Sequence, residues 1–291
     1  MTVPATSPWN LRLVRRKATN GLLWVGAVVA TAAALLPLGM VLYYVAAQGL
    51  SSISLSFFTQ LPKPVGEAGG GMANALVGSL ILVGLASLIG LPIGLLGGIY
   101  LAEFGNGRLG WAIRFTADVL SGVPSIVIGM FVLALVVIPM GGVSAVAGGC
   151  ALGLMMVPIA MRTTEELVRM VPMSLREGSL ALGATHWRTV AKVVMQAAKG
   201  GVITGVLLAI ARVAGEAAPI LFTAGSTQWW NMKVTEGPMS SLPVQIFLYA
   251  GSPFEEWHQQ AWGGALVLVT MVLILSVAAR YATRGRMRIV R

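Results

Sequence analysis

The amino-acid sequence predicts an all-α integral membrane protein with six transmembrane helices. Of its 291 residues, 56% are hydrophobic and only 10% are charged, whereas about 25% of the residues of a typical soluble protein are charged. A soluble core cannot bury so much apolar surface, but membrane helices can, because lipid covers their outer faces. Six segments are long and apolar enough to cross a bilayer, which takes about 20 helical residues. They are residues 21–47, 72–101, 119–140, 143–161, 200–224 and 262–279.

The first two segments each carry a distinguishing feature. Segment 21–47 is too long for a signal-peptide core and no small-residue cleavage site follows it, so we expect it to stay in the protein. Segment 72–101 contains Pro92, which predicts a kink or an early end of this span. Three of its glycines recur every fourth residue and predict a smooth helix face for close packing. They are Gly90, Gly94 and Gly98.

The other four segments are apolar runs bounded by loops or charges. Segment 119–140 contains Pro124 close to its start, and segment 143–161 is closed by Arg162. Segment 200–224 contains Arg212, and segment 262–279 ends before an arginine-rich tail. The predicted organisation is therefore one transmembrane domain with a basic tail at each end. The domain covers residues 21–284, the tails cover residues 1–20 and 285–291, and a basic loop covers about residues 162–199.

The distribution of positive charge predicts the orientation. Seventeen of the 20 Lys and Arg residues lie before the first segment, after the last one, and in the loops after the second and fourth segments, whereas the loops on the opposite side hold only Lys63 and Lys233. The seventeen are Arg12, Arg15, Arg16, Lys17, Arg108, Arg114, Arg162, Arg169, Arg176, Arg188, Lys192, Lys199, Arg280, Arg284, Arg286, Arg288 and Arg291. Because Lys and Arg are retained on the cytoplasmic side, both termini are expected in the cytoplasm. The net charge of +10 then reflects orientation in the lipid membrane, not a nucleic-acid partner.

The sequence lacks the motifs of an enzyme active site. No Gly-x-x-x-x-Gly-Lys-Ser/Thr motif occurs, so no Walker A nucleotide site is expected. His186 and His258 are isolated from other metal ligands, and the single Cys150 excludes an intrachain disulfide. No convincing Ser-His-Asp arrangement is present either. We therefore expect no catalytic residue, metal or cofactor in this chain, and any ATP hydrolysis that drives the protein would take place on another chain.

The loop 162–199 has the features of a helical hairpin. Ser174 and Glu177 have the Ser-x-x-Glu spacing of a capping box at the start of a short helix. Gly183 allows a turn, and a second helix is expected over residues 185–199. Glu177 either caps this first helix only, or belongs to a helix that docks on a cytoplasmic partner. The spacing alone favours neither interpretation.

The same loop resembles the EAA loop of bacterial ABC importer permeases. In that family a Glu is followed by two small residues and, six positions after the Glu, by a Gly. Glu177, Gly178, Ser179 and Gly183 match this pattern, whereas Gln196 stands where the family often has a proline. The resemblance implies the MetI-like permease fold with six helices. It also implies that residues 177–183 enter a cleft on an ATPase subunit and couple its closure to transport.

Three further motifs resemble a narrower group, the A-type subunits of the phosphate-specific (Pst) permeases. They are DVLSGVPSIV at 118–127, ARVAGEAAPILFTA at 211–224 and SLPVQI at 241–246, and the resemblance runs from about residue 74 to the C-terminus. It implies import of inorganic phosphate across the bacterial inner (plasma) membrane. The implied partners are a second, C-type permease subunit forming a heterodimer, an ATPase dimer and an extracytoplasmic phosphate-binding protein. The loop that contains Trp229 and Trp230 would be the docking surface for this last partner.

Arg212 and Glu216 are candidate substrate-pathway residues. Their spacing of four places both on one face of a helix, where they can pair. An unpaired charge at mid-bilayer costs at least about 2.5 kcal/mol, so such residues face protein or water. They form either a structural ion pair between spans or an anion site. The second role is favoured, because a guanidinium has donors that match two phosphate oxygens and keeps its charge at neutral pH.

Three more residues are weaker candidates for the pathway. Arg162 is a positive-inside anchor by its place at the end of a span, and the family resemblance makes it a second pathway arginine. Ser121 and Ser125 flank Pro124 and could donate hydrogen bonds to an oxyanion, with help from a helix N-terminus. They could equally satisfy backbone groups that the proline frees.

Alternative functions differ in what they require of the sequence. A permease for another oxyanion, such as sulfate or molybdate, or the C-type sibling subunit, shares most of these features. An ATP-independent anion channel or carrier needs no hairpin for an ATPase, so the loop at 177–183 argues against it. A membrane scaffold or sensor needs no charged pair within a span, so Arg212 and Glu216 argue against that.

Overall fold

The computed structural model describes residues 8–65, 67 and 69–284, and contacts divide the chain into two compact units. The first unit ends at Gln48 and consists of most of helix α1 (Pro8–Gly49), which contains the predicted segment 21–47. Most of its apolar side chains, such as Leu22, Trp24 and Leu36, are exposed, as expected of a helix surrounded by lipid. The predicted tail 285–291 and the first seven residues of the other tail lie outside the described residues.

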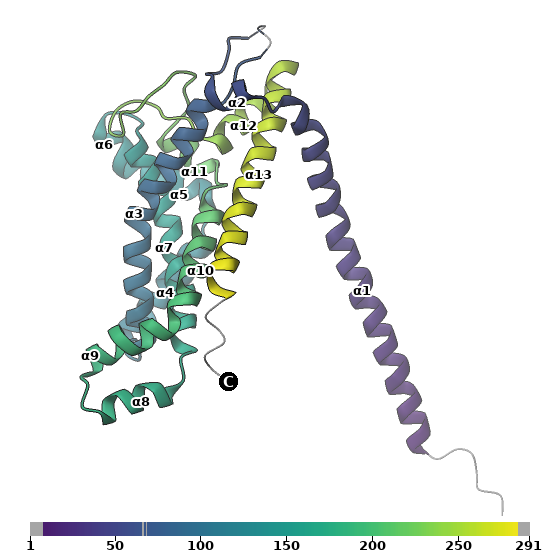
Figure 1. Cartoon of the computed structure of the whole chain (residues 1–291), viewed down its shortest axis with the longest axis vertical. Coiled ribbons are helices and arrows are strands. Elements are labelled where there is room, and N and C mark those ends of the chain that lie inside the picture. Colours follow the sequence, from purple (N-terminus) through teal and green to yellow (C-terminus); the bar gives the residue numbers. More distant parts are fainter. Residues whose placement is uncertain (1–7, 66, 68, 285–291) are drawn as a thin grey trace, which may run out of the picture. The chain divides into compact units, whose positions relative to one another are not determined.

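The second unit, from Gly49 onward, is a bundle of helices (Figure 1). The long helices in chain order are α3 (Ala73–Glu103), α4 (Arg108–Gly122), α7 (Ala145–Arg169), α10 (Met195–Val213) and α13 (Glu255–Arg284). The shorter ones are η1 (Leu50–Ser52), α2 (Leu55–Thr59), α5 (Ser125–Val132), η2 (Leu133–Val137), α6 (Ile138–Met140), α8 (Met173–Ala181), α9 (His186–Thr189), η3 (Val190–Val194), α11 (Ala218–Thr223) and α12 (Leu242–Ala250). The described residues contain no strand, so the predicted all-α class is confirmed.

The bundle has two chemically different ends. Helix α3 ends, α4 begins and α7 ends at the same end, which also carries α8 and α9, at the bottom of Figure 1. We call it the basic end, because it carries Arg108, Arg169 and Arg176. The opposite end carries α2, α12 and the long connection between α11 and α12. There Asn74 donates a hydrogen bond of 2.7 Å to the carbonyl of Thr227 and so attaches that connection to α3.

The central contact of the bundle is between α3 and α7, and it depends on glycine. A Cβ placed at Gly98 would lie 2.5 Å from the carbonyl oxygen of Met161, and one at Gly90 would lie 2.7 Å from that of Gly153. At Gly94 it would lie 2.6 Å from Cβ of Ala160. The three glycines therefore form the contact face that their spacing predicts, and Pro92 lies within α3 without ending it.

A valine at Gly94 should disrupt this contact. We expect Gly94→Val to destabilise the bundle by about 1–3 kcal/mol, because the new side chain has to push α3 and α7 apart. The measurement is the thermal unfolding temperature of the detergent-purified protein. Gly84→Val is the matched control, because Gly84 lies on the same helix and no other atom lies within 4 Å of its added Cβ. Equal unfolding temperatures for the two variants would contradict the prediction.

The third predicted span differs from the structure. Segment 119–140 is predicted as one helix, but the helix begins earlier, at Arg108, and bends by 105° between Gly122 and Ser125. Val123 and Pro124 have extended backbone there, because proline cannot continue the hydrogen-bond ladder. Arg108 and Arg114 therefore lie on α4 and not in a loop. Five single helices are long and apolar enough to span a membrane, and counting this bent pair gives six in the described part of the chain.

The fifth predicted span is also corrected. Residues 185–199 and 200–224 are predicted as a hairpin helix followed by a separate span, but His186–Val213 is one long helix that contains α9, η3 and α10. It stops at Val213, and the chain resumes a helix only at α11. Pro219 at the start of α11 lacks the N–H needed to continue the ladder. Similarly, α7 continues to Arg169, beyond the predicted end at residue 161.

Candidate functional site

Two interrupted helices meet beside α7 and enclose a cavity. The α4–α5 break lies near the α10–α11 break, and a Cβ added at Gly129 of α5 would lie 2.8 Å from Cα of Pro219 in α11. The cavity has a volume of about 450 Å³. It is lined by Leu120, Ser121, Val123, Ser125, Ile128, Met155, Pro158, Ile159, Arg212 and Glu216. The structure thus brings together four of the five residues that the sequence singles out as a pathway.

Arg212 and Glu216 line this cavity but do not form the expected pair. Arg212 lies in the last turn of α10 and its side chain is exposed, whereas Glu216 lies beyond the helix end and is half-buried. The predicted shared helix face is wrong because the helix stops at Val213, and the Glu216 N–H donates to the Val213 carbonyl in a turn. Among the described residues, no hydrogen bond or ion pair involves the Arg212 guanidinium. Its donors are therefore available to an anion in the cavity.

The two serines differ in what they offer to the cavity. The Ser121 hydroxyl donates to the carbonyl of Ala117 on its own helix at 2.9 Å. It therefore offers only acceptor lone pairs to a ligand in the cavity. This contact is the backbone-directed role that the sequence left open. Ser125 is the first residue of α5, directly after Pro124. Its hydroxyl and the first N–H groups of α5 are the neutral donors near the break.

Arg162 lies next to the cavity, not in its wall. It is one turn from Pro158 on α7 and well inside that helix, so the prediction that it ends the span is wrong. Its guanidinium forms two hydrogen bonds with Asp118 on α4. Nε donates to Oδ1 at 2.9 Å, and a terminal nitrogen donates to Oδ2. The other terminal nitrogen lies 3.4 Å from Glu165.

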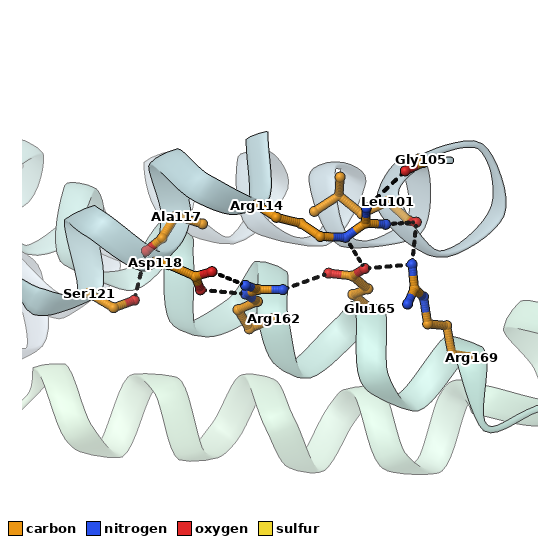
Figure 2. Close-up of polar contacts among 9 residues, drawn as sticks. All are labelled: Leu101, Gly105, Arg114, Ala117, Asp118, Ser121, Arg162, Glu165 and Arg169. Carbon is orange, nitrogen blue, oxygen red and sulfur yellow. Dashed lines mark hydrogen bonds and ion pairs between the residues drawn. The ribbon is translucent and has the colours of Figure 1, made fainter. Parts of the chain in front are cut away.

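Sequence reasoning missed the group around Glu165, shown in Figure 2. The Glu165 side chain is only 4% exposed, accepts a hydrogen bond from Arg114 at 2.6 Å and forms an ion pair with Arg169 at 2.9 Å, besides its contact with Arg162. Arg114 also donates to the carbonyl of Leu101 in the last turn of α3 and to that of Gly105 just beyond the helix. We call Asp118, Arg114, Arg162, Glu165 and Arg169 the Glu165 cluster. It joins α3, α4 and α7 at the basic end.

A sequence signal for part of this cluster was present. Arg162, Glu165 and Arg169 have the spacings of three and four that place side chains on one helix face. That signal predicts contacts only within α7. Arg114 and Asp118 come from another helix, more than 40 residues earlier, and their pairing depends on how α4 packs on α7.

The predicted coupling loop forms a short helix and a turn. Helix α8 begins after Pro172, which has no side-chain cap, so the predicted Ser174–Glu177 capping box is wrong. Proline fixes the backbone before α8, and Ser174 falls inside the helix. Gly183 has a φ of +81°, a conformation that favours glycine, and its N–H donates to the Leu180 carbonyl.

The remaining predicted coupling residues have different surroundings. Glu177 and Gly178 are exposed in the middle of α8. The Ser179 hydroxyl is 2.9 Å from that of Thr189 and connects α8 to α9. Arg176 attaches helix α8 to the bundle. From the sequence, Arg176 was identified only as one of the basic residues of the loop 162–199. Its guanidinium pairs with the buried Glu103 of α3 at 2.7 Å and also donates to the carbonyls of Val168 and Val171.

Comparison with known proteins decides the family. Residues 94–287 match the family described as "Binding-protein-dependent transport system inner membrane component". The phosphate transport system permease protein PstA of Yersinia pestis is 46% identical over 82% of this chain and 81% of the relative. The PstA of Haemophilus influenzae is 42% identical over 93% of this chain and 96% of the relative. The chain belongs to the PstA family. It is therefore a transmembrane component of an ABC importer and of the inner membrane.

Solved structures support the PstA-family fold. The methionine ABC transporter MetNI, in an inward-facing conformation, aligns with a TM-score of 0.59 at 20% identity and covers 74% of this chain and 94% of the other chain. A bacterial ABC transporter involved in the import of the polysaccharide alginate aligns with a TM-score of 0.61 at 13% identity. The alignment covers 96% of this chain and 100% of the other chain. At these identities the likeness shows the fold alone, and it confirms the predicted permease architecture.

Within this PstA-family fold, the basic end exposes apolar side chains. Six large apolar side chains on and beside α8 and α9 are exposed: Met170, Met173, Leu175, Leu180, Leu182 and Trp187. Leu182, beside Gly183 in the turn, is 91% exposed. Exposed apolar groups that gather beside a charged region are typical of a protein–protein contact.

Proposed function

We propose that this chain is the transmembrane subunit of an ATP-driven importer of inorganic phosphate. The observation that carries the proposal is the unpaired Arg212 guanidinium in the wall of a cavity between two helix breaks. Transporters place substrate sites at such breaks, where loose backbone and helix ends face a cavity. An arginine offers a phosphate two parallel charge-assisted hydrogen bonds. The PstA relatives, named for phosphate transport, identify the oxyanion.

The proposal includes the partners that complete the transporter. Arg212 is exposed in the isolated chain, so a second permease subunit of the C type would close the other side of the pathway. Two ATPase subunits would dock on α8, and an extracytoplasmic phosphate-binding protein would dock at the opposite end, near Trp229 and Trp230. In this proposal the ATPase subunits, and not this chain, hydrolyse ATP. Both termini would then lie in the cytoplasm.

Reconstituted transport tests the substrate. The complex of this chain with its C-type, ATPase and binding-protein partners is placed in lipid vesicles, and uptake of radiolabelled phosphate is followed with and without ATP. We expect ATP-dependent uptake that excess phosphate competes away and equal sulfate or molybdate does not. Uptake that sulfate abolishes, or that needs no ATP, would support the other-oxyanion or the channel alternative instead.

Site-specific labelling tests the orientation. In a Cys150→Ala background, a cysteine at Ser179 should react in intact cells only with permeant reagents, and one at Trp229 should also react with an impermeant reagent. Labelling of the Ser179 position from outside would reverse the proposed orientation.

The turn at Gly183 tests the coupling role of α8. We expect Gly183→Val to lower phosphate uptake by about tenfold or more while ATP hydrolysis continues, because a β-branched residue is strained at φ +81° and shifts α8. Gly183→Asn is the matched control, since asparagine tolerates this backbone conformation. Wild-type uptake by the valine variant would contradict the coupling role.

A further inference from the structure

One ion pair stands between the cavity and the basic end. Asp118 is three residues before Ser121 on α4, and Arg162 is four residues after Pro158 on α7; Ser121 and Pro158 line the cavity. Both steps lead toward the basic end, because α4 begins there and α7 ends there. The Asp118–Arg162 pair therefore bridges α4 and α7 about one helical turn, or ~5 Å, beyond the cavity. Figure 2 shows Ser121 beside this pair.

Asp118 occupies the part of Arg162 that an oxyanion would use. A carboxylate and a phosphate both accept two parallel hydrogen bonds from one edge of a guanidinium. Asp118 takes that edge, through Nε and one terminal nitrogen. The remaining terminal nitrogen faces Glu165. Asp118 therefore occupies the edge of Arg162 that could bind an anion, and Glu165 contacts the remaining terminal nitrogen.

The two carboxylates differ in how easily an anion could replace them. The Asp118 side chain is 58% exposed, whereas that of Glu165 is 4% exposed and also binds Arg114 and Arg169. Displacing Glu165 would strand a buried charge, which is strongly unfavourable. Displacing Asp118 strands no buried charge, because most of its side chain is exposed in the isolated chain. An incoming anion would therefore exchange with Asp118 and not with Glu165.

A purely structural role explains Asp118 poorly. The Arg114–Glu165 pair already joins α4 to α7, and Arg114 also binds the carbonyls of Leu101 and Gly105. A second, exposed ion pair between α4 and α7 adds little to the stability of this contact, because solvent weakens exposed ion pairs. Its position next to the cavity suits a role in transport better.

We propose that Asp118 is a displaceable counter-ion that competes with phosphate for Arg162 and so sets how readily phosphate leaves the cavity. This inference rests on the proposed function. Phosphate leaving Arg212 takes the two-donor edge of Arg162 while Asp118 turns to solvent. Asp118 then returns to that edge and repels the anion toward the basic end. Without Asp118, phosphate stays bound to Arg162.

The test measures binding and transport in the same complex. Equilibrium binding of radiolabelled phosphate is measured for the detergent-purified complex, and uptake is measured in vesicles. We expect Asp118→Asn to tighten phosphate binding by about tenfold and to slow uptake by a similar factor, which is within the energy of one charge-assisted contact. The double variant Asp118→Asn/Arg162→Gln should lose the tighter binding. Glu166→Gln, an exposed acid on the same helix α7, is the control and should match wild type.

The outcomes separate this inference from the proposed function. Wild-type binding and uptake in Asp118→Asn would overturn the inference alone. A complex that fails to assemble with Asp118→Asn, but regains assembly and normal uptake in the double neutral variant, would show a structural pair and also overturn it. Absence of phosphate uptake by the wild-type complex would overturn the proposed function, and the inference with it.

Discussion

Arg212→Lys is expected to reduce phosphate uptake by about tenfold or more while the complex assembles normally. Lysine keeps the charge but loses the fork of donors that grips two phosphate oxygens, and losing one charge-assisted contact accounts for about a tenfold change. Assembly should survive, because the Arg212 side chain is exposed and has no ion-pair partner among the described residues. Uptake in vesicles and yield of the purified complex are the two measurements.

Glu216 provides the contrast to Arg212. The less favoured interpretation of the sequence was a structural pair, in which either single change impairs assembly and the neutral double variant restores transport. The helix ends at Val213 and no ion pair joins the two side chains among the described residues, so we expect Glu216→Gln to have a milder effect than Arg212→Lys. We expect no rescue in the double variant. Near-normal uptake by Arg212→Gln/Glu216→Gln would exclude Arg212 as the residue that recognises the anion.

The second large effect is expected at Glu165, and it concerns stability. Glu165→Gln leaves Arg114, Arg162 and Arg169 around a neutral side chain, so three cations lose a buried counter-charge. Breaking a buried ion pair costs about 3–5 kcal/mol, and the partial exposure of the arginines places the expected loss near the lower value. The yield and unfolding temperature of the complex should therefore fall sharply.

The adjacent acid is the matched control for Glu165. Glu166 has the same chemistry one residue later on α7, but its side chain is exposed. Glu166→Gln should leave yield and unfolding temperature unchanged. If Glu165→Gln behaves like Glu166→Gln, the Glu165 cluster does not hold α3, α4 and α7 together.

Local patterns predicted much of this fold. Hydropathy identified the spanning helices, and the spacing of Gly90, Gly94 and Gly98 identified the face on which α3 packs. The breaks were missed for one shared reason. Apolar residues continue on both sides of Pro124 and of residues 214–217, whereas the backbone hydrogen-bond ladder is interrupted there. Assuming a continuous helix there also produced the wrong geometry for Arg212 and Glu216.

The sequence predicted which residues line the candidate site better than it predicted the contacts between them. Ser121, Ser125, Arg212 and Glu216 line one cavity, although their transport roles stay predictions. The pairing of Arg162 with Asp118 and of Arg176 with Glu103 joins residues 44 and 73 positions apart. Such partners are chosen by tertiary packing, which no spacing rule within one helix can supply. The same limit hid Glu165.

The glycine contact between α3 and α7 has a mechanical consequence. Backbone approaches backbone closely at Gly90 and Gly98, so we expect the two helices to resist sliding and to move as one rigid lever. Arg176 fastens α8 to the end of this lever through Glu103 and the carbonyls of Val168 and Val171. If ATPase subunits dock on α8 as proposed, a push on α8 would be transmitted along both helices as one motion. The bent α4–α5 pair and the α10–α11 break would then be the joints at which that motion changes the cavity.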